Sequence, residues 1–449
     1  MKDTIVSIST PLGKGAISIV RMSGAKSLEI ALKLFYAQNL FDVKPRYMYF
    51  GKIRLEDVYE ECLMVYFKGP FSFTGEDIVE FQIHGGVLLA QKVVEVCLKN
   101  GARLAEAGEF SKRAFINGKI TLDKAEAIIG EINAETEGEL KSSLQVTNGK
   151  LASLILEQQE KLKLLIAELE VGMDYPDETD EINLHIDIKN RVEEINNTLK
   201  ILIQQAESAK CLKNGINVAL VGKTNVGKSS VMNALLGQNR AIVTDIQGTT
   251  RDSITESFIH KGIKINLVDT AGIRETEDIV ENIGIEKSKK SLENADIILF
   301  VLDGSEKLTK EDEKIKNLLK NKQFITIINK TDKKRIVEKQ QNELEISALQ
   351  NKNIEELKTL TVETVVKEEI DFNTLVLTNE RHVSVLKSAQ NTLEDILKLE
   401  KSRDEFFEPS LEVIILQAKK AWQILGKITG NTENEDIINL IFSKFCLGK

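Results

Sequence analysis

The stretch INVALVGKTNVGKSS, residues 216–230, decides the fold of the central part of the chain. Its apolar beginning is typical of a buried strand, and Gly222–Ser229 fits the pattern G-x-x-x-x-G-K-[S/T]. In such a loop the glycines let backbone N–H groups surround phosphates at a helix N-terminus, while Lys228 neutralises phosphate oxygens and Ser229 offers its hydroxyl to Mg²⁺. The helical SSVMNALLG that follows completes a strand, a loop and a helix. A chance glycine-rich turn is therefore a poor explanation.

Two motifs further along the chain specify the nucleotide. The sequence DTAG, residues 269–272, ends the strand-like INLV, where its aspartate would hold Mg²⁺ through water. The sequence NKTD, residues 329–332, ends the strand-like FITII. Its Asp332 can accept hydrogen bonds from the N1–H and the N2 amino group of guanine, a donor pair that adenine lacks. Ser347 and Ala348 suit a loop whose backbone amide contacts the guanine carbonyl. In this order and on these strands, the motifs predict a GTPase domain.

Three positions bear on hydrolysis. The sequence GTTRD, residues 248–252, stands in the position of a switch I loop, where Thr250 is the natural second side-chain ligand of Mg²⁺. Ile273 stands where Ras-type enzymes place the glutamine that orients water, and an isoleucine cannot orient a nucleophile. The amide oxygen of Asn225 could help bind a monovalent cation beside the phosphates, in place of an arginine finger. The candidates for orienting the water are the acidic residues Glu275, Glu277, Asp278 and Glu281.

The hydrophobic pattern changes three times along the chain. The first hundred or so residues alternate β-rich runs with glycine-rich turns and two helical patterns, which predicts a compact α+β or α/β unit. Long helical patterns follow from about Thr121, then alternating strands and helices from 216 to about 370, and helices again after Asn379. We expect a helical domain made of two separated pieces with an α/β domain inserted between them. The expected boundaries are 1–118, 119–212, 213–372 and 373–449.

Composition excludes several classes of protein. The chain has 449 residues, and about 150 residues per domain suggests roughly three domains. Four distant cysteines and four histidines argue against a disulfide framework or a zinc cluster. The net charge of −9 argues against non-specific nucleic-acid binding by the whole surface, although the excess lies within residues 130–181. The absence of a signal segment and of a long apolar run predicts a cytoplasmic protein without a membrane span.

Taken together, the motifs resemble one family over essentially the whole chain. The GTPase motifs, the flanking helical pieces, SFTGED at 72–77, HGG at 84–86 and the terminal FCLGK at 445–449 are similar to the MnmE (TrmE) family of tRNA modification GTPases. The resemblance implies a tetrahydrofolate-binding-like N-terminal domain, a discontinuous helical domain and an inserted Ras-like P-loop GTPase domain. It also implies a potassium-activated GTPase whose G domains dimerise when K⁺ and GTP are bound.

The resemblance further implies partners and a reaction. The implied assemblies are a homodimer formed through the N-terminal domains and a heterotetramer with the FAD-dependent protein MnmG. The complex would form a carboxymethylaminomethyl or aminomethyl group at C5 of the wobble uridine of certain tRNAs, from 5-formyltetrahydrofolate or a related donor. The alternative is a GTP-switched protein of ribosome assembly. Such proteins usually append a compact RNA-binding module, whereas this chain offers helices and the terminal FCLGK.

The resemblance also assigns roles to residues of this chain. It places Asn225, Thr244, Ile246 and Thr249 at potassium, and Ser229 and Thr250 at Mg²⁺. It gives Glu281 the role of orienting the hydrolytic water. It places Arg21, Glu80, Lys119 and Lys449 at the folate derivative, and leaves open a redox or substrate-side role for Cys446. The residues expected to contact GTP are Asn225, Val226, Gly227, Lys228, Ser229, Ser230, Thr244, Asp245, Ile246, Gln247, Gly248, Thr249, Thr250, Asp269, Thr270, Ala271, Gly272, Asn329, Lys330, Asp332, Ser347 and Ala348.

Overall fold

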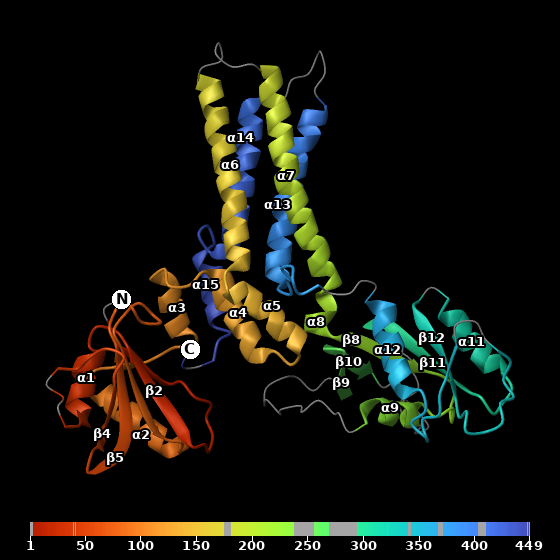
Figure 1. The fold of residues 1–449 in the computed structure, drawn as a ribbon, viewed down its shortest axis with the longest axis horizontal. Coiled ribbons are helices and arrows are strands. Elements are labelled where there is room, and N and C mark those ends of the chain that lie inside the picture. The colour runs from red at the N-terminus through yellow and green to blue at the C-terminus, as the bar shows by residue number, and fades with distance from the viewer. Residues whose placement is uncertain are drawn as a thin grey trace, which may run out of the picture. The chain divides into compact units, whose positions relative to one another are not determined.

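The computed structural model divides into two compact units, which are treated separately below (Figure 1). The first unit joins Met1–Ile132, Leu144–Asn197 and Ser384–Lys449, and the second joins Asn133–Ser143 and Thr198–Val383. The structure describes residues 3–38, 40, 42–174, 181–237, 256–268, 294–320, 322–339, 343–366, 371–402, 410–446 and 448, without side chains for 181–185.

The N-terminal part of the first unit is a seven-stranded sheet with the order β3-β4-β5-β6-β2-β1-β7. Neighbouring strands are antiparallel except for β1 and β7. Helices α1 and α2 pack on one face and enclose the core of this sheet. The strands are β1 (Ile5–Ile8), β2 (Ile17–Ser23), β3 (Phe35–Tyr36), β4 (Met48–Leu55), β5 (Val58–Phe67), β6 (Ile78–His84) and β7 (Arg103–Leu104), and the helices are α1 (Ser27–Leu34) and α2 (Val87–Lys99).

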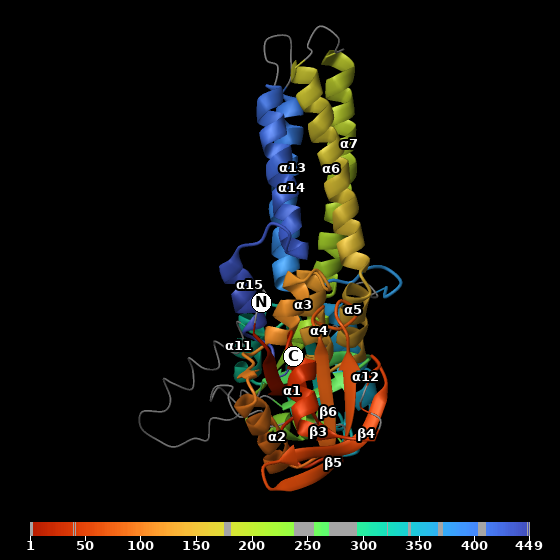
Figure 2. The same cartoon turned by 90° about the vertical axis from the view of Figure 1, so that its left-hand side faces the viewer.

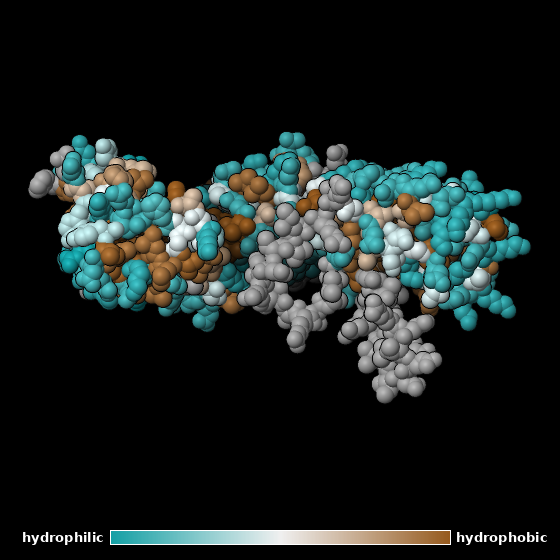
Figure 3. Space-filling model, turned by 90° about the horizontal axis from the view of Figure 1, so that it is seen from below, coloured by the Kyte–Doolittle hydropathy of each residue, from teal (hydrophilic) through white to brown (hydrophobic). Residues whose placement is uncertain are grey.

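The other face of this sheet carries exposed apolar side chains. Strand β4 alternates exposed and buried residues along its whole length, as expected for a sheet covered on one side. Met48 and Phe50 of β4 are 52% and 67% exposed, and Tyr36 and Tyr59 beside them meet edge to face with ring centroids 6.0 Å apart. Figure 3 shows apolar surface over this part of the first unit.

Long helices form the rest of the first unit. Helix α6 (Lys150–Asp174) packs on α14 (Leu411–Thr429), and both run beside those parts of α7 (Glu181–Ser208) and α13 (Glu380–Lys401) that belong to the first unit (Figure 2). Buried leucines and isoleucines recur at helical spacing on α6, which gives one apolar face. Helix α5 (Glu137–Thr147) ends just before Asn148-Gly149, where Gly149 has φ +86°.

The C-terminal segment packs against the N-terminal part of the same unit. Phe442 and Phe445, at and after the end of α15 (Glu435–Phe442), pack with Leu122 of α4 (Leu122–Asn133). A Cβ on Gly108, before α3 (Glu109–Ile116), would lie 2.2 Å from the carbonyl oxygen of Phe442. Farther along, the hydroxyl of Ser9 donates to the carbonyl oxygen of Gly448 at 3.2 Å. Gly448 therefore lies beside the end of β1.

The second unit contains a doubly wound α/β domain. Its six strands have the order β13-β12-β11-β8-β10-β9, and all pairs are parallel except β9 with β10. Buried clusters on both faces include residues of α9 and α12 on one side and of the α11 region on the other. The elements are α8 (Lys210–Asn214), β8 (Ile216–Val221), α9 (Lys228–Leu236), β9 (Glu256–His260), β10 (Ile263–Val268), β11 (Ile297–Asp303), α11 (Lys310–Leu318), β12 (Phe324–Asn329), β13 (Glu343–Glu345) and α12 (Ile354–Val365).

The expected multidomain architecture, α/β with a helical domain, is confirmed. Every residue of β11 is buried, which is typical of a central parallel strand covered on both faces.

Among the described helices, none has the length and apolar character that crossing a membrane requires.

Candidate functional site

The phosphate loop, Gly222–Gly227, connects β8 to α9 at the carboxyl end of the parallel sheet. Glycine is required at both ends because neighbouring strands approach closely. A Cβ on Gly222 would lie 2.3 Å from the carbonyl oxygen of Val301, and one on Gly227, whose φ is +96°, would lie 2.5 Å from Nδ2 of Asn329. The loop is therefore held against the strands that follow it, which is where open α/β sheets bind ligands.

Lys228 lies over the phosphate loop. Its Nζ donates to the carbonyl oxygens of Gly222 and Lys223 at 2.7 and 2.8 Å. This places an ammonium group at the N-terminus of α9, where backbone N–H groups also favour an anion. The exposed hydroxyl of Ser229 follows in the first turn of the helix, and an oxygen ligand of this kind suits Mg²⁺.

Asn329 connects the phosphate loop to the loop after β13. Its side chain is buried, its Nδ2 donates to the carbonyl oxygen of Val226 at 3.0 Å, and its Oδ1 accepts from the backbone N–H of Ala348 at 3.1 Å. Three predicted segments therefore meet at one amide side chain. Because a buried amide with both ends bonded is costly to break, this contact fixes the spacing between the loops.

Asp332 presents a carboxylate at the surface of this cluster. It is exposed, and its Oδ1 accepts a 2.7 Å hydrogen bond from the hydroxyl of Ser347. That hydrogen bond lowers the pKa of Asp332 below its ordinary value, so the group is charged at neutral pH. An ionised carboxylate held in place can accept the paired N–H groups of guanine.

The sequence reasoning missed the contact that holds Lys330. The Nζ of Lys330 donates to the carbonyl oxygen of Asn225 at 2.8 Å and to Oδ2 of Asp303 at 2.6 Å. Asp303 ends β11 and lies directly across from Asn329 in the parallel register. Burial raises the pKa of Asp303, but hydrogen bonds from Lys330 and Ser305 outweigh it and leave the pKa below its ordinary value. The signal in the sequence was an aspartate that ends the apolar run IILFVL, as Asn329 ends FITII.

Several predicted residues lie outside the part of the chain that the structure describes. The predictions for the switch region, the second motif, the water-orienting glutamate and the terminal lysine therefore stay predictions. They are Thr244, Asp245, Ile246, Gln247, Gly248, Thr249, Thr250, Asp269, Thr270, Ala271, Gly272, Glu281 and Lys449.

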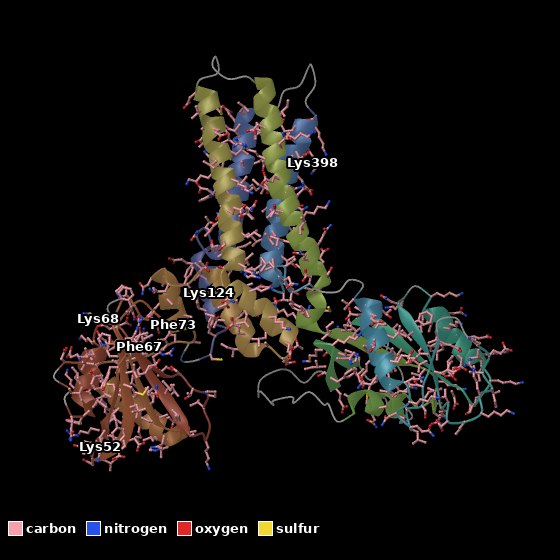
Figure 4. All side chains as sticks on the ribbon, in the orientation of Figure 1. Lys52, Phe67, Lys68, Phe73, Lys124 and Lys398 are labelled. Carbon is pink, nitrogen blue, oxygen red and sulfur yellow. The ribbon has the colours of Figure 1, made fainter. Side chains whose placement is uncertain are left out.

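A second polar centre lies on the N-terminal sheet of the first unit. Arg21 of β2 and Glu80 of β6 face each other in the antiparallel register, and Nε of Arg21 lies 2.7 Å from Oε1 of Glu80. The guanidinium carbon lies 6.0 Å from the ring centroid of Phe73, labelled in Figure 4, and 5.9 Å from that of Phe110. Both charged side chains stay partly exposed, at 22% and 13%. A planar group with hydrogen-bonding edges suits such a setting.

Lys119 lies near the same loop as Phe73. A Cβ on Gly75 would lie 3.3 Å from Cγ of Lys119, and Nδ2 of Asn117 donates to the carbonyl oxygen of Thr74 at 2.7 Å. The stem of Lys119 therefore lies against the loop 69–77. Cys446 is exposed, two residues before the glycine that contacts Ser9.

Beneath this loop lies a buried ionic network that the sequence reasoning also missed. The side chain of Arg113 is only 1% exposed and contacts Glu109 at 2.9 Å, Asp3 at 2.9 Å and Glu76 at 3.1 Å. The hydroxyl of Ser23 donates to the same Glu76 at 2.8 Å. The network joins α3, the chain start, β2 and the loop 69–77, so it supports the position of Phe73.

Known families and proteins match the chain along nearly its whole length. The N-terminal residues 4–119 match the family described as GTP-binding protein TrmE N-terminus, and residues 122–446 match the MnmE helical domain. The tRNA modification GTPase MnmE of Clostridioides difficile (strain 630) is 43% identical over 100% of this chain and 99% of its own length. The protein of the same description from Alkaliphilus metalliredigens (strain QYMF) is 41% identical over 100% of both chains.

Solved structures of two other proteins match part of the chain. Aquifex aeolicus Era bound to GDP and aluminium fluoride is 30% identical, with 42% of this chain and 68% of that chain covered and a TM-score of 0.27. The G domain of T. maritima FeoB is 25% identical, with 33% and 98% covered and a TM-score of 0.26. The family matches and the full-length relatives, in contrast, span all parts of the chain. The chain belongs to the MnmE family of tRNA modification GTPases and is a GTP hydrolase that acts in tRNA modification.

Proposed function

We propose that the chain is a potassium-activated GTPase that, with the FAD-dependent protein MnmG, forms the carboxymethylaminomethyl or aminomethyl group at C5 of the wobble uridine of certain tRNAs. A tetrahydrofolate derivative would supply the one-carbon unit. The observation that carries the proposal is Arg21, flanked by two aromatic rings and paired with Glu80, in a chain whose other unit holds a guanine-nucleotide site. A simple GTP switch would need the guanine-nucleotide site but not the centre around Arg21.

The guanine-nucleotide site would work by positioning and by charge. Asp332 selects guanine, Asn329 keeps the base loop and the phosphate loop together, and Lys228 stabilises charge on the phosphate oxygens. Ser229 would hold Mg²⁺, which neutralises charge on the phosphates of the bound nucleotide. In the proposal Thr250 is the other Mg²⁺ ligand and Glu281 orients the water, and both lie outside the described residues.

Potassium would supply the positive charge that an arginine finger supplies elsewhere. Asn225 is exposed and has φ +63°, a left-handed conformation that asparagine tolerates better than most residues. Its carbonyl oxygen is already bonded to Lys330, so in the proposal its side-chain oxygen is the potassium ligand. Thr244, Ile246 and Thr249 would complete the set. Hydrolysis should be much faster in K⁺ than in Na⁺ of the same concentration, and equal rates would contradict this part of the proposal.

The centre on the N-terminal sheet would hold the folate derivative. A pterin ring can lie against Phe73 and offer its amino and ring N–H groups to Glu80, while Arg21 and Lys119 meet carboxylate or formyl oxygens. Lys449 would enter from the chain end, which the contact between Ser9 and Gly448 brings to this sheet. Cys446 remains a candidate for a redox or substrate-side role.

Assembly is the last element of the proposal. The exposed Met48 and Phe50 on the uncovered sheet face support homodimerisation through the N-terminal domain. The proposed domain limits are 1–118, 119–212, 213–372 and 373–449, so this face belongs to the first domain and the GTPase domain is 213–372. The experiment that tests the whole proposal is nucleoside analysis of tRNA from cells that lack the protein. The C5 substituent of the wobble uridine should be absent, and an unchanged profile would contradict the proposal.

A further inference from the structure

The segment from the last residue of β11 to the first turn of α11, residues 303–312, contacts both halves of the nucleotide site. At its start, Asp303 pairs with Lys330 of the guanine motif at 2.6 Å. Farther along, Glu306 and Asp312 approach Nζ of Lys223, in the phosphate loop, at 2.9 and 3.7 Å. None of these acidic residues belongs to the motifs that bind nucleotide.

The carboxylate of Asp303 is buried and held from several directions. Asp303 is 6% exposed, and its Oδ1 accepts hydrogen bonds from the backbone N–H and the hydroxyl of Ser305 at 2.8 and 2.7 Å. Its other oxygen, Oδ2, meets the ammonium group of Lys330. A charged group fixed in this way has one orientation, so it also fixes its partner.

The ammonium group of Lys330 is the junction between the two halves. It reaches the carbonyl oxygen of Asn225 at 2.8 Å while it pairs with Asp303. Next to it, Asn329 bonds Val226, so two consecutive residues of the guanine motif hold two consecutive residues of the phosphate loop. Without Asp303, the ammonium group would lose its buried counter-charge and the stem of Lys330 could turn away from the loop.

We propose that Asp303 is a positioning residue for GTP binding, which acts by holding Lys330 against the phosphate loop so that the two halves of the site keep the spacing that the nucleotide spans. The proposal rests on the GTPase activity and is independent of the roles proposed for potassium and folate. The other reading is that Asp303 only stabilises the fold of the second unit.

The test compares Asp303→Asn, Lys330→Met and the double variant in the full-length protein, by fluorescence titration with GDP and by steady-state GTP hydrolysis. Asparagine keeps the shape and can still accept from Ser305, but loses the charge. We expect Asp303→Asn to raise the Kd for GDP and the KM for GTP about tenfold or more, as for a lost charged hydrogen bond. The kcat at saturating GTP should change by less than about twofold, since the residue does not touch the reacting atoms.

The double variant decides between positioning and general stabilisation. If Asp303 acts through Lys330, the Kd of the double variant for GDP is no higher than the higher of the two Kd values of the single variants. Multiplied effects of the two changes would overturn the proposal, as would an unchanged Kd in Asp303→Asn. The matched control is Glu363→Gln, which breaks the exposed pair of Glu363 with Lys261 in the same unit and should leave Kd and KM unchanged.

A milder change protects the test against a folding defect. If Asp303→Asn does not fold, Ser305→Ala keeps the charge but removes one donor to the carboxylate. It should raise the Kd for GDP about threefold, a partial loss of one hydrogen bond, and no increase would overturn the proposal. Failure of the unaltered protein to bind GDP is a different result, because it would contradict the GTPase assignment itself.

Discussion

The guanine-nucleotide site and the centre around Arg21 are built by sheets of opposite kinds. In the parallel sheet of the second unit, the strands end at one edge, so short motifs that follow β8, β12 and β13 meet there. In the antiparallel sheet of the first unit, Arg21 and Glu80 meet because of the register of β2 and β6. Contiguous motifs therefore reveal the first centre, whereas the second is made of single residues far apart in the sequence.

The largest expected effect is a loss of GTP turnover, without a loss of folate binding, when the phosphate loop is altered. Lys228→Ala removes the ammonium group that lies over Gly222, and GTP turnover should fall by about a thousandfold, the scale of losing a main electrostatic contact. Phosphate release under excess GTP measures it. Binding of 5-formyltetrahydrofolate should stay unchanged, and so should turnover in the control Lys314→Ala, an exposed lysine of α11. Turnover within tenfold of normal in Lys228→Ala would contradict the role given to Lys228.

The next effect concerns the stability of the first unit. Arg113→Met leaves Asp3, Glu76 and Glu109 without their buried counter-charge, and the free energy of unfolding should fall by about 3 to 5 kcal/mol. Urea unfolding followed by circular dichroism measures it.

The matched variant for this network is Arg103→Met, because Arg103 contacts Glu109 and Asp3 as well but is 44% exposed. It should lose about 1 kcal/mol or less. Equal losses in the two variants would contradict the importance of burial. Affinity for GDP should be retained in Arg113→Met, because the network belongs to the first unit.

A smaller effect tests the proposed folate site. Glu80→Gln keeps the size of the side chain but removes the charge that pairs with Arg21 and would accept the pterin N–H groups. The Kd for 5-formyltetrahydrofolate should rise about tenfold, by isothermal titration, while GTP turnover stays the same. The control Glu61→Gln removes an exposed carboxylate of β5, 3.5 Å from Lys52 (Figure 4). A variant Glu80→Gln that binds as tightly as the unaltered protein would remove Glu80 from the site.

The smallest effect is a pH dependence. Burial raises the pKa of Glu109, but hydrogen bonds from Arg103, the backbone of Glu106 and Arg113 outweigh it, so the pKa lies below the ordinary 4.5. The folded state therefore holds its proton less tightly than the unfolded state. The stabilisation is present above pH 4.5 and is lost as the pH falls through the lowered value. The free energy of unfolding, measured between about pH 6 and about pH 3, should change less with pH in Glu109→Gln than in the unaltered protein. An identical dependence on pH in the two proteins would contradict this.

The strands of the GTPase domain were predictable because pattern and motif agree there. The strand expected at the beginning of the stretch 216–230 is β8, Ile216–Val221, and the strand-like FITII before NKTD lies in β12, Phe324–Asn329. Asp303 was not recognised, because one aspartate at a strand end has no spacing that distinguishes it from a turn. Its role depends on the register with Asn329, which only the sheet order provides.

The N-terminal sheet was less predictable for a similar reason. Strand β4, Met48–Leu55, was not expected, since Gly51 interrupts it and a glycine inside a strand reads as a turn. The glycine is needed because a Cβ there would lie 2.4 Å from the carbonyl oxygen of Tyr36. The ionic network around Arg113 was not predicted from the sequence either, because the acidic partners of Arg113 are spread over residues 3–109.

The central claim is that both centres serve one tRNA modification. Nucleoside mass spectrometry of tRNA from cells that carry only Lys228→Ala or only Glu80→Gln tests it most directly, with Lys314→Ala and Glu61→Gln as controls. We expect both test variants to lose the same C5 substituent of the wobble uridine and both controls to keep it. A normal substituent in the Lys228→Ala cells, with the variant protein present at its usual level, would contradict the proposed function.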